Sequence, residues 1–160
     1  MKKLDSNLVE LLAKNERWNE VDNIMEEYRE LTERLEVDRL EVQELFYRII
    51  NYLKSDDPNL RDLGATYVMN TSRELYWKIP VRIRKRIRSA LKGKKKRTGV
   101  YDENFYVAFR AACAVVEHDM FNVGDVLFLE RILKRGSYDP EVRDIALTYL
   151  EKLKNYKKVF

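Results

Sequence analysis

The sequence predicts an all-α protein, on three observations. Apolar residues recur at the three- and four-residue spacing of amphipathic helices along most of the 160 residues. Asp-Pro pairs, which typically begin helices, occur at Asp57 and Asp139. No segment predicts a strand, and 45% hydrophobic against 36% charged residues is typical of a folded chain. We therefore expect a single helical domain over residues 1–160, with about eight helices.

The first 37 residues are expected to form an acidic helical hairpin. Apolar residues at 8–12 are followed by a long amphipathic segment from Trp18 to Leu35. Four acids crowd that segment: Glu26, Glu27, Glu30 and Glu33. No Glu-x-x-His motif accompanies them, as a di-iron bundle would require, so we interpret them as a solvated face and expect no metal site. The long segment packs internally or forms the seam of a homodimer, and both alternatives stay open.

Residues 39–156 carry a repeated pattern. The stretches "DPNLRDLGATYV" from Asp57 and "DPEVRDIALTYL" from Asp139 share Asp, Pro, Arg, Asp, Thr and Tyr at matching positions. Between them, "DENFYVAFRAACAVV" from Asp102 has the same apolar spacing. Each of the three is expected to follow a partner helix, because apolar stripes also begin at Val42, Ile83 and Val123. The pattern predicts three helical hairpins.

These hairpins resemble HEAT repeats, which pair antiparallel helices and place Asp before the second helix and Arg one turn into it. Asp57 with Arg61 and Asp139 with Arg143 fit that motif, and both arginines are expected to form structural ion pairs. The middle unit departs from it, because Tyr106 stands where Arg is expected. The resemblance implies a stacked array of hairpins that serves as a binding scaffold. An irregular helical bundle is the alternative fold.

No catalytic signature is found, and we expect neither an enzyme nor a cofactor. The chain has one Cys and one His, Cys113 and His118. On a helix they point about 140° apart, so they do not form a nucleophile–base pair. Cys113 lies on an apolar stripe, which predicts burial, and His118 is expected near the end of the same helix. The glycines in "KGKKKRTG" lack the spacing of a phosphate-binding loop.

One block of the chain is strongly cationic. Residues 78–97 hold 11 of the 31 Lys and Arg residues and no acid, which leaves 20 cations against 27 acids elsewhere. Ile83, Ile87 and Leu91 predict a helix whose remaining circumference is cationic, running into a loop at 94–97. The candidate binding residues are Arg82, Arg84, Lys85, Arg86, Arg88, Lys92, Lys94, Lys95, Lys96 and Arg97.

We hypothesise that this helix and loop (82–97) bind nucleic acid, as DNA, RNA or part of a ribonucleoprotein. A phosphate backbone would neutralise the face, and arginine suits bidentate phosphate contacts. Tyr76, Trp77 and Tyr101 flank the block and could stack on bases. The alternative is a protein scaffold that docks an acidic protein surface or the acidic part of a second copy. A solvated face with intramolecular ion pairs is the third interpretation.

A cytoplasmic location is the simplest expectation. The lone cysteine excludes an internal disulfide, and the start "MKKLDSNLVELLAKNE" lacks the apolar stretch of a signal peptide. The longest apolar stretch, 111–116, is far shorter than a membrane span, so we expect no membrane partner. The scarcity of Gln, Cys and His among abundant Glu, Lys and Arg is common in thermophile proteins.

Overall fold

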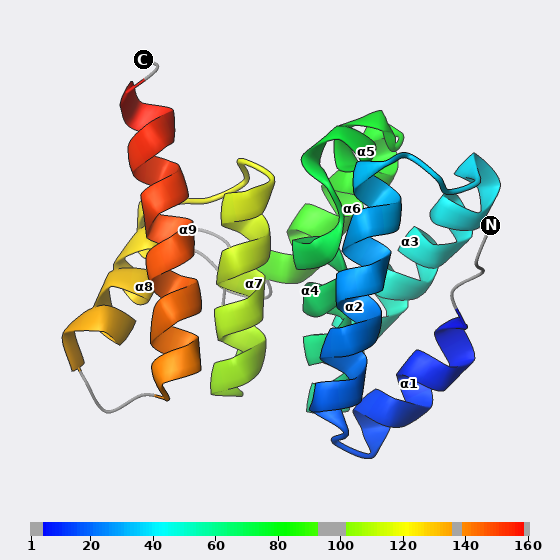
Figure 1. Ribbon diagram of the computed structural model, residues 1–160, viewed down its shortest axis with the longest axis horizontal. Helices are drawn as coiled ribbons and strands as arrows, with labels where there is room; N and C mark the ends of the chain where they lie inside the picture. The colour runs from blue at the N-terminus through cyan, green and yellow to red at the C-terminus, as the bar shows by residue number, and fades with distance from the viewer. Residues whose placement is uncertain (1–4, 93–101, 136–138, 159–160) are drawn as a thin grey trace.

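The apolar stripes become helices, and the prediction of an all-α fold is confirmed (Figure 1). The computed structural model describes residues 5–92, 102–135 and 139–158, with side chains up to Lys154. Within these ranges every regular element is a helix, and there are nine. They are α1 (Ser6–Lys14), α2 (Trp18–Glu33), α3 (Arg39–Leu53), α4 (Pro58–Asn70), α5 (Arg73–Lys78), α6 (Val81–Lys92), α7 (Phe105–Glu117), α8 (Val123–Arg135) and α9 (Pro140–Lys158).

The helix starts follow from side chains that cap free N–H groups. As predicted, Asp57 caps α4, because its carboxylate accepts a hydrogen bond of 2.9 Å from the Asn59 N–H and Pro58 occupies the first turn. Helix α5 is the element that the prediction missed. It has six residues, begins at a Ser72 cap and stops before Pro80, so it is too short to show a period of its own.

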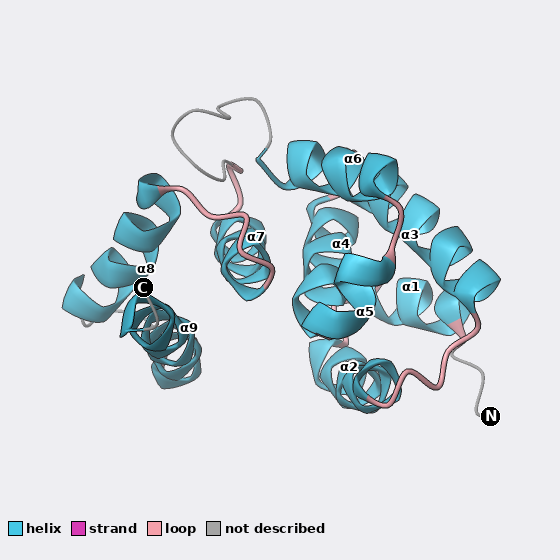
Figure 2. Ribbon diagram, turned by 90° about the horizontal axis from the view of Figure 1, so that it is seen from above, coloured by secondary structure: helices cyan, strands magenta, loops and turns pink. Residues whose placement is uncertain are grey.

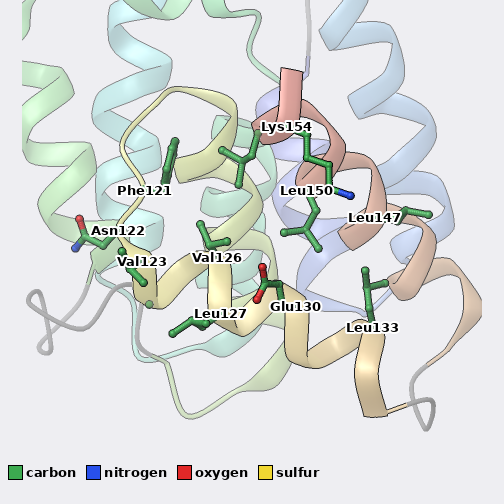
Figure 3. A pocket seen from close by; sticks show the side chains of 12 residues that line it. Phe121, Asn122, Val123, Val126, Leu127, Glu130, Leu133, Leu147, Leu150 and Lys154 are labelled. Carbon is green, nitrogen blue, oxygen red and sulfur yellow. The ribbon is translucent and has the colours of Figure 1, made fainter. Parts of the chain in front are cut away.

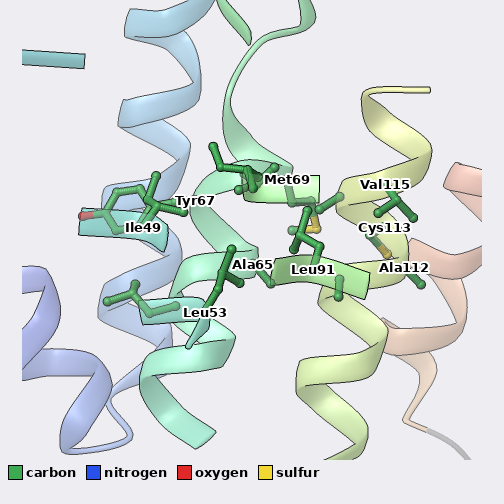
Figure 4. Packing of buried hydrophobic residues seen from close by; sticks show 14 of the residues in the cluster. Ile49, Leu53, Ala65, Tyr67, Met69, Leu91, Ala112, Cys113 and Val115 are labelled. Atoms are coloured by element: carbon green, nitrogen blue, oxygen red, sulfur yellow. The ribbon is translucent and has the colours of Figure 1, made fainter. Parts of the chain in front are cut away.

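Helix α4 lies at the centre of the fold. It packs against α1, α2, α3 and α7, and every residue from Asp62 to Asn70 is buried. Gly64 lets α3 approach closely, because a Cβ there would lie 3.0 Å from Leu53 Cγ. Figure 4 shows side chains of α3, α4, α6 and α7 meeting in this core. The buried cluster is continuous from Val9 to Leu153, so the helices share one hydrophobic core.

The remaining helices surround this centre as hairpins and neighbours. Helix α3 pairs with α4, and α8 pairs with α9. Helix α3 also lies beside α6, and α7 lies between α4 and the last hairpin (Figures 1 and 2). Helices α1 and α2 pack together over the free sides of α4. The finer prediction of HEAT-like stacking stays a prediction.

Two ion pairs join α4 to the unit that follows it. Arg61 binds Asp102 through two hydrogen bonds, Nε to Oδ2 at 2.8 Å and an Nη to Oδ1 at 3.1 Å. Arg110 of α7 approaches Asp62 of α4, with 3.3 Å between Nε and Oδ1. The expected ion pair of Arg61 is therefore confirmed. The one expected of Arg143 is wrong for the described residues, where its guanidinium donates instead to the Leu133 carbonyl at 3.4 Å.

His118 ends α7 and is fully buried between α7 and α4. Its Nε2 lies 2.8 Å from the Val68 carbonyl and its ring stacks on Tyr76, while Nδ1 is buried without a hydrogen-bond partner among the described residues. Burial, together with the charges of Arg73 and Lys152, lowers the pKa of His118 to about 4. The ring is therefore neutral at pH 7, with Nε2 donating to Val68.

Acid should destabilise the fold through His118. Its pKa is about 6.5 in the unfolded chain and about 4 in the folded one, so its contribution to stability is complete above pH 6.5 and is lost as the pH falls toward 4. Between pH 7.5 and 4 the free energy of unfolding should fall by about 3 kcal/mol more in the wild type than in His118→Gln. Urea unfolding at both pH values measures this difference, and parallel losses in the two proteins would contradict it.

Candidate functional site

Helix α6 presents the cationic block on an outer side of the molecule (Figure 2). Ile83, Ile87 and Leu91 are buried against α3 and α7, which fixes how the helix is rotated. Arg82, Lys85, Arg86 and Arg88 are exposed and Arg84 is half-buried. These five residues, called the cationic face below, lie where the sequence predicts them. Lys94, Lys95, Lys96 and Arg97 fall outside the described residues.

Lys92 was predicted on the same face, and the structure places it in the interior. Its side chain is 4% exposed, and Nζ lies 2.7 Å from Oδ2 of Asp125, whose side chain is fully buried. The same Asp125 oxygen accepts a hydrogen bond from the Asn122 N–H at 2.8 Å. The cause is tertiary, because the Lys92 side chain in the last turn of α6 reaches Asp125 in the first turn of α8. Lys92 therefore joins two helices and is excluded from the cationic face.

The cationic face has two flanks, and each contacts an exposed aromatic residue. At 100° per residue, Arg84 and Arg88 lie on one side of the buried stripe and Arg82 and Arg86 on the other. The Arg84 guanidinium lies 4.5 Å from the centroid of the Trp77 ring. On the opposite flank Arg86 lies 5.8 Å from the Tyr47 centroid, and Arg82 donates to the Tyr47 hydroxyl at 3.5 Å.

The sequence predicts only some of the aromatic residues that lie beside the cationic face. Trp77 is 48% exposed and beside the face, as proposed from the sequence. Tyr76 is instead fully buried, and Tyr101 lies outside the described residues. Tyr47 of α3 was missed, although it is 37% exposed. Its position off the stripe formed by Val42, Phe46 and Ile49 signals an outward direction, but only the packing of α3 against α6 brings it to the arginines.

The electrostatics of α6 are locally unfavourable. No ion pair joins a residue of the cationic face to an acid in the described part of the chain. Like charges stand four residues apart at Arg82/Arg86 and Arg84/Arg88, and each such pair repels. The first turn has no acid, so two arginines lie at the positive end of the helix dipole.

The acids gather on another side of the molecule. Helix α2 exposes Asp22, Glu26, Glu27, Glu30 and Glu33. In Figure 2, α2 and α6 lie on opposite sides of α4. The acidic helix therefore does not neutralise the cationic face within one molecule.

Two hollows elsewhere are chemically different from the cationic face. A groove of about 920 Å³ between α8 and α9 is lined mainly by apolar side chains, including Val126, Leu127 and Leu150 (Figure 3). A second, of about 410 Å³, lies among α2, α4, α7 and α9. Its charged residues are balanced between bases and acids: Arg29, Arg110 and Lys152 against Asp22, Glu26 and Glu141. Neither concentrates positive charge.

The residues considered for catalysis and metal binding lie either in the hydrophobic core or on the exposed face of a helix. Cys113 is fully buried, as predicted, and burial raises the pKa of its thiol to about 12. The acids Glu26, Glu27, Glu30 and Glu33 are exposed on α2. Among the residues that the structure describes, no three His, Cys, Asp or Glu side chains are grouped so as to hold a metal ion.

No described helix has both the length and the apolar character of a membrane-spanning segment. Comparisons of the chain with known protein families, with curated proteins and with solved structures find no match.

Removing Lys92 should cost far more stability than removing the ion pair as a whole. Lys92→Met removes the Lys92 charge from beside the buried Asp125 carboxylate, and we expect the free energy of unfolding to fall by about 3–5 kcal/mol. In the double variant Lys92→Met/Asp125→Asn the new amide still accepts from the Asn122 N–H, so most of that loss should be recovered. Urea unfolding of the wild type, the two single variants and the double variant gives the coupling energy. Equal stability of Lys92→Met and the double variant would contradict the role assigned to this pair.

Proposed function

We propose that this protein is a non-catalytic, cytoplasmic binding protein that contacts nucleic acid, free or within a ribonucleoprotein, through the cationic face of α6. The observation that carries the proposal is the cationic face itself, whose five Lys and Arg residues have no acid partner among the described residues. Lys94, Lys95, Lys96 and Arg97 belong to the proposal from the sequence.

Phosphate is the counter-charge that suits this surface best. Four of the five residues are arginines, whose planar guanidinium groups make bidentate hydrogen bonds to phosphate oxygens. A nucleic-acid backbone presents phosphates in a regular row, and the release of condensed counterions gives affinity without sequence preference. The two exposed aromatic rings beside the arginines add a surface on which bases can stack.

The charge pattern of α6 argues against an ordinary solvated face. Elsewhere some cations pair with acids, as at Arg61–Asp102, Lys92–Asp125 and Lys152–Glu117, and others among the described cations stand singly on the surface. The cationic face has no such partners in the described residues, and it also opposes the helix dipole. An unfavourable local pattern of this kind is expected where function requires it.

An acidic protein surface is the second candidate partner, and the exposed acids of α2 support one version of it. Because α2 and α6 lie on opposite sides of α4, the acidic helix of one copy could meet the cationic face of another (Figure 2). Such self-association would appear as a mass that rises with concentration in analytical ultracentrifugation and falls with added salt.

For the architecture, we infer a HEAT-like array. Three observations support it: helices pair in hairpins, α4 stacks on α7, and Arg61 of one unit binds Asp102 of the next. An array of this kind displays an extended binding surface along one layer of helices.

Salt should weaken nucleic-acid binding steeply. If about five phosphates are contacted, the affinity for duplex DNA should fall about 500-fold between 50 and 200 mM salt. Replacing Arg82, Lys85, Arg86 and Arg88 by Ala removes four of these contacts and should reduce the fall to about 3.5-fold. Arg84 is retained there because its Nε donates to the Ile79 carbonyl at 2.9 Å. Fluorescence anisotropy of labelled oligonucleotides measures both effects.

A second quadruple variant controls for net charge. Arg131, Lys134, Arg135 and Lys154 are exposed on α8 and α9, away from α6. Changing these four to Ala removes the same total charge and should leave the affinity and the salt slope nearly unchanged. An equal loss in both variants would mean that net charge alone attracts the nucleic acid. Absence of binding by the wild type at 50 mM salt would refute the proposal.

A further inference from the structure

We infer that the cationic face selects single-stranded nucleic acid, with unpaired bases stacking at Trp77 on one flank of α6 and at Tyr47 on the other. This inference rests on the proposed function and names the class of nucleic acid that the surface takes. It depends on the two rings and on the arginines that hold them, whereas general binding depends on the charges alone.

Trp77 and Arg84 form a preassembled stack. The Arg84 guanidinium is fixed at two points, by its 2.9 Å hydrogen bond to the Ile79 carbonyl and by its position 4.5 Å from the Trp77 ring centroid. Trp77 also contacts the buried Tyr76 ring edge-to-face, with 6.0 Å between the two ring centroids. Nearly half of the Trp77 side chain nonetheless stays in solvent. A base can therefore extend the stack without the cost of ordering flexible side chains.

Tyr47 repeats this arrangement on the opposite flank. It projects from α3, and its ring and hydroxyl contact Arg86 and Arg82 respectively. Each flank of α6 therefore combines an exposed aromatic ring with arginines that can hold a phosphate. A base that stacks on either ring places its own backbone beside those arginines.

Most of the exposed tyrosine and tryptophan rings lie beside the cationic face. Among the described residues, the exposed tyrosine and tryptophan residues are Tyr47, Trp77 and Tyr106. Two of the three contact arginines of the cationic face. Tyr106 instead packs edge-to-face on Phe105 in α7, and within the described residues no arginine of α6 lies over its ring. These two rings at the cationic face, Tyr47 and Trp77, therefore lie where a bound strand would meet both an aromatic ring and an arginine.

The width of α6 fits a strand that crosses it. A helix with its side chains is about 10–12 Å across, which corresponds to about three nucleotides at the 3.4 Å rise of a stacked strand. Lys85 lies between the flanks on the outermost line of the helix, where it can meet the phosphates between the two stacked bases. A duplex keeps its bases paired inside, so it can use the charges but neither ring.

Substitution of the rings should separate the two contributions. We expect Trp77→Ala and Tyr47→Ala each to weaken binding of a 12-nucleotide single strand by about 5- to 100-fold. The affinity for duplex should change by less than about twofold. The salt slopes for strand and duplex should stay the same, because no phosphate contact is lost. Trp77→Phe and Tyr47→Phe keep a ring and should retain most of the affinity. Tyr106→Ala is the matched control and should change neither affinity.

The measurements use anisotropy with labelled DNA and RNA strands of one unstructured sequence and with the corresponding duplexes, after thermal unfolding shows that each variant is folded. Stacking has its own signal in a Trp18→Phe background, where Trp77 is the remaining tryptophan. The single strand should quench Trp77 fluorescence, and the duplex should not.

The outcomes are distinguishable. Binding that is lost only in the variant lacking Arg82, Lys85, Arg86 and Arg88, with unchanged affinities in both ring-to-Ala variants and no quenching, would overturn the single-strand inference and leave the proposed function standing. Equal losses for strand and duplex in the ring variants would also overturn it. No binding of any oligonucleotide at 50 mM salt would overturn both.

Discussion

The packing of α4 against α7 is the constraint on which the rest of the structure depends. Both helices are buried on nearly every side, so their polar groups must be satisfied inside the protein. Asp62 meets Arg110 across the contact, and His118 bonds to the Val68 carbonyl. Because α4 and α7 occupy the centre of the fold, α6 contacts the core through a single apolar stripe. The opposite side of α6 is therefore free to carry charge at no cost to the core.

The sequence predicts the fold well where a helix has one buried face. Helices α3 and α6 follow their apolar stripes, and Asp57 caps α4 as expected. The all-round burial of α4 could not be predicted, because Thr66 and Asn70 read as polar positions. Thr66 donates to Asp62 and Asn70 to the Thr66 carbonyl, so these groups are satisfied within the helix. Burial of polar residues thus depends on local hydrogen bonds that hydrophobic periodicity does not report.

The candidate site was predictable as a charge pattern and less so as a geometry. The direction of Arg82, Lys85, Arg86 and Arg88 follows from the stripe that includes Ile83 and Ile87. The burial of Lys92 does not, because its partner Asp125 is 33 residues further along the chain. Tyr47 likewise joins the site through the packing of α3 against α6. Helical periodicity gives the direction of a side chain from its own helix, whereas its neighbours come from tertiary structure.

The placement of the cations on α6 says more about function than the net charge of the chain does. At Arg61, Lys92 and Arg110 the fold supplies an acid where a cation joins two parts of the structure. On α6 the repulsion between neighbouring arginines and the adverse helix dipole are retained, although 27 acids exist elsewhere in the chain. Each of these costs is a few tenths of a kcal/mol or more, so together they are comparable with a lost hydrogen bond. A bound phosphate backbone would offset both costs. It adds negative charge beside the arginines and at the positive end of the helix.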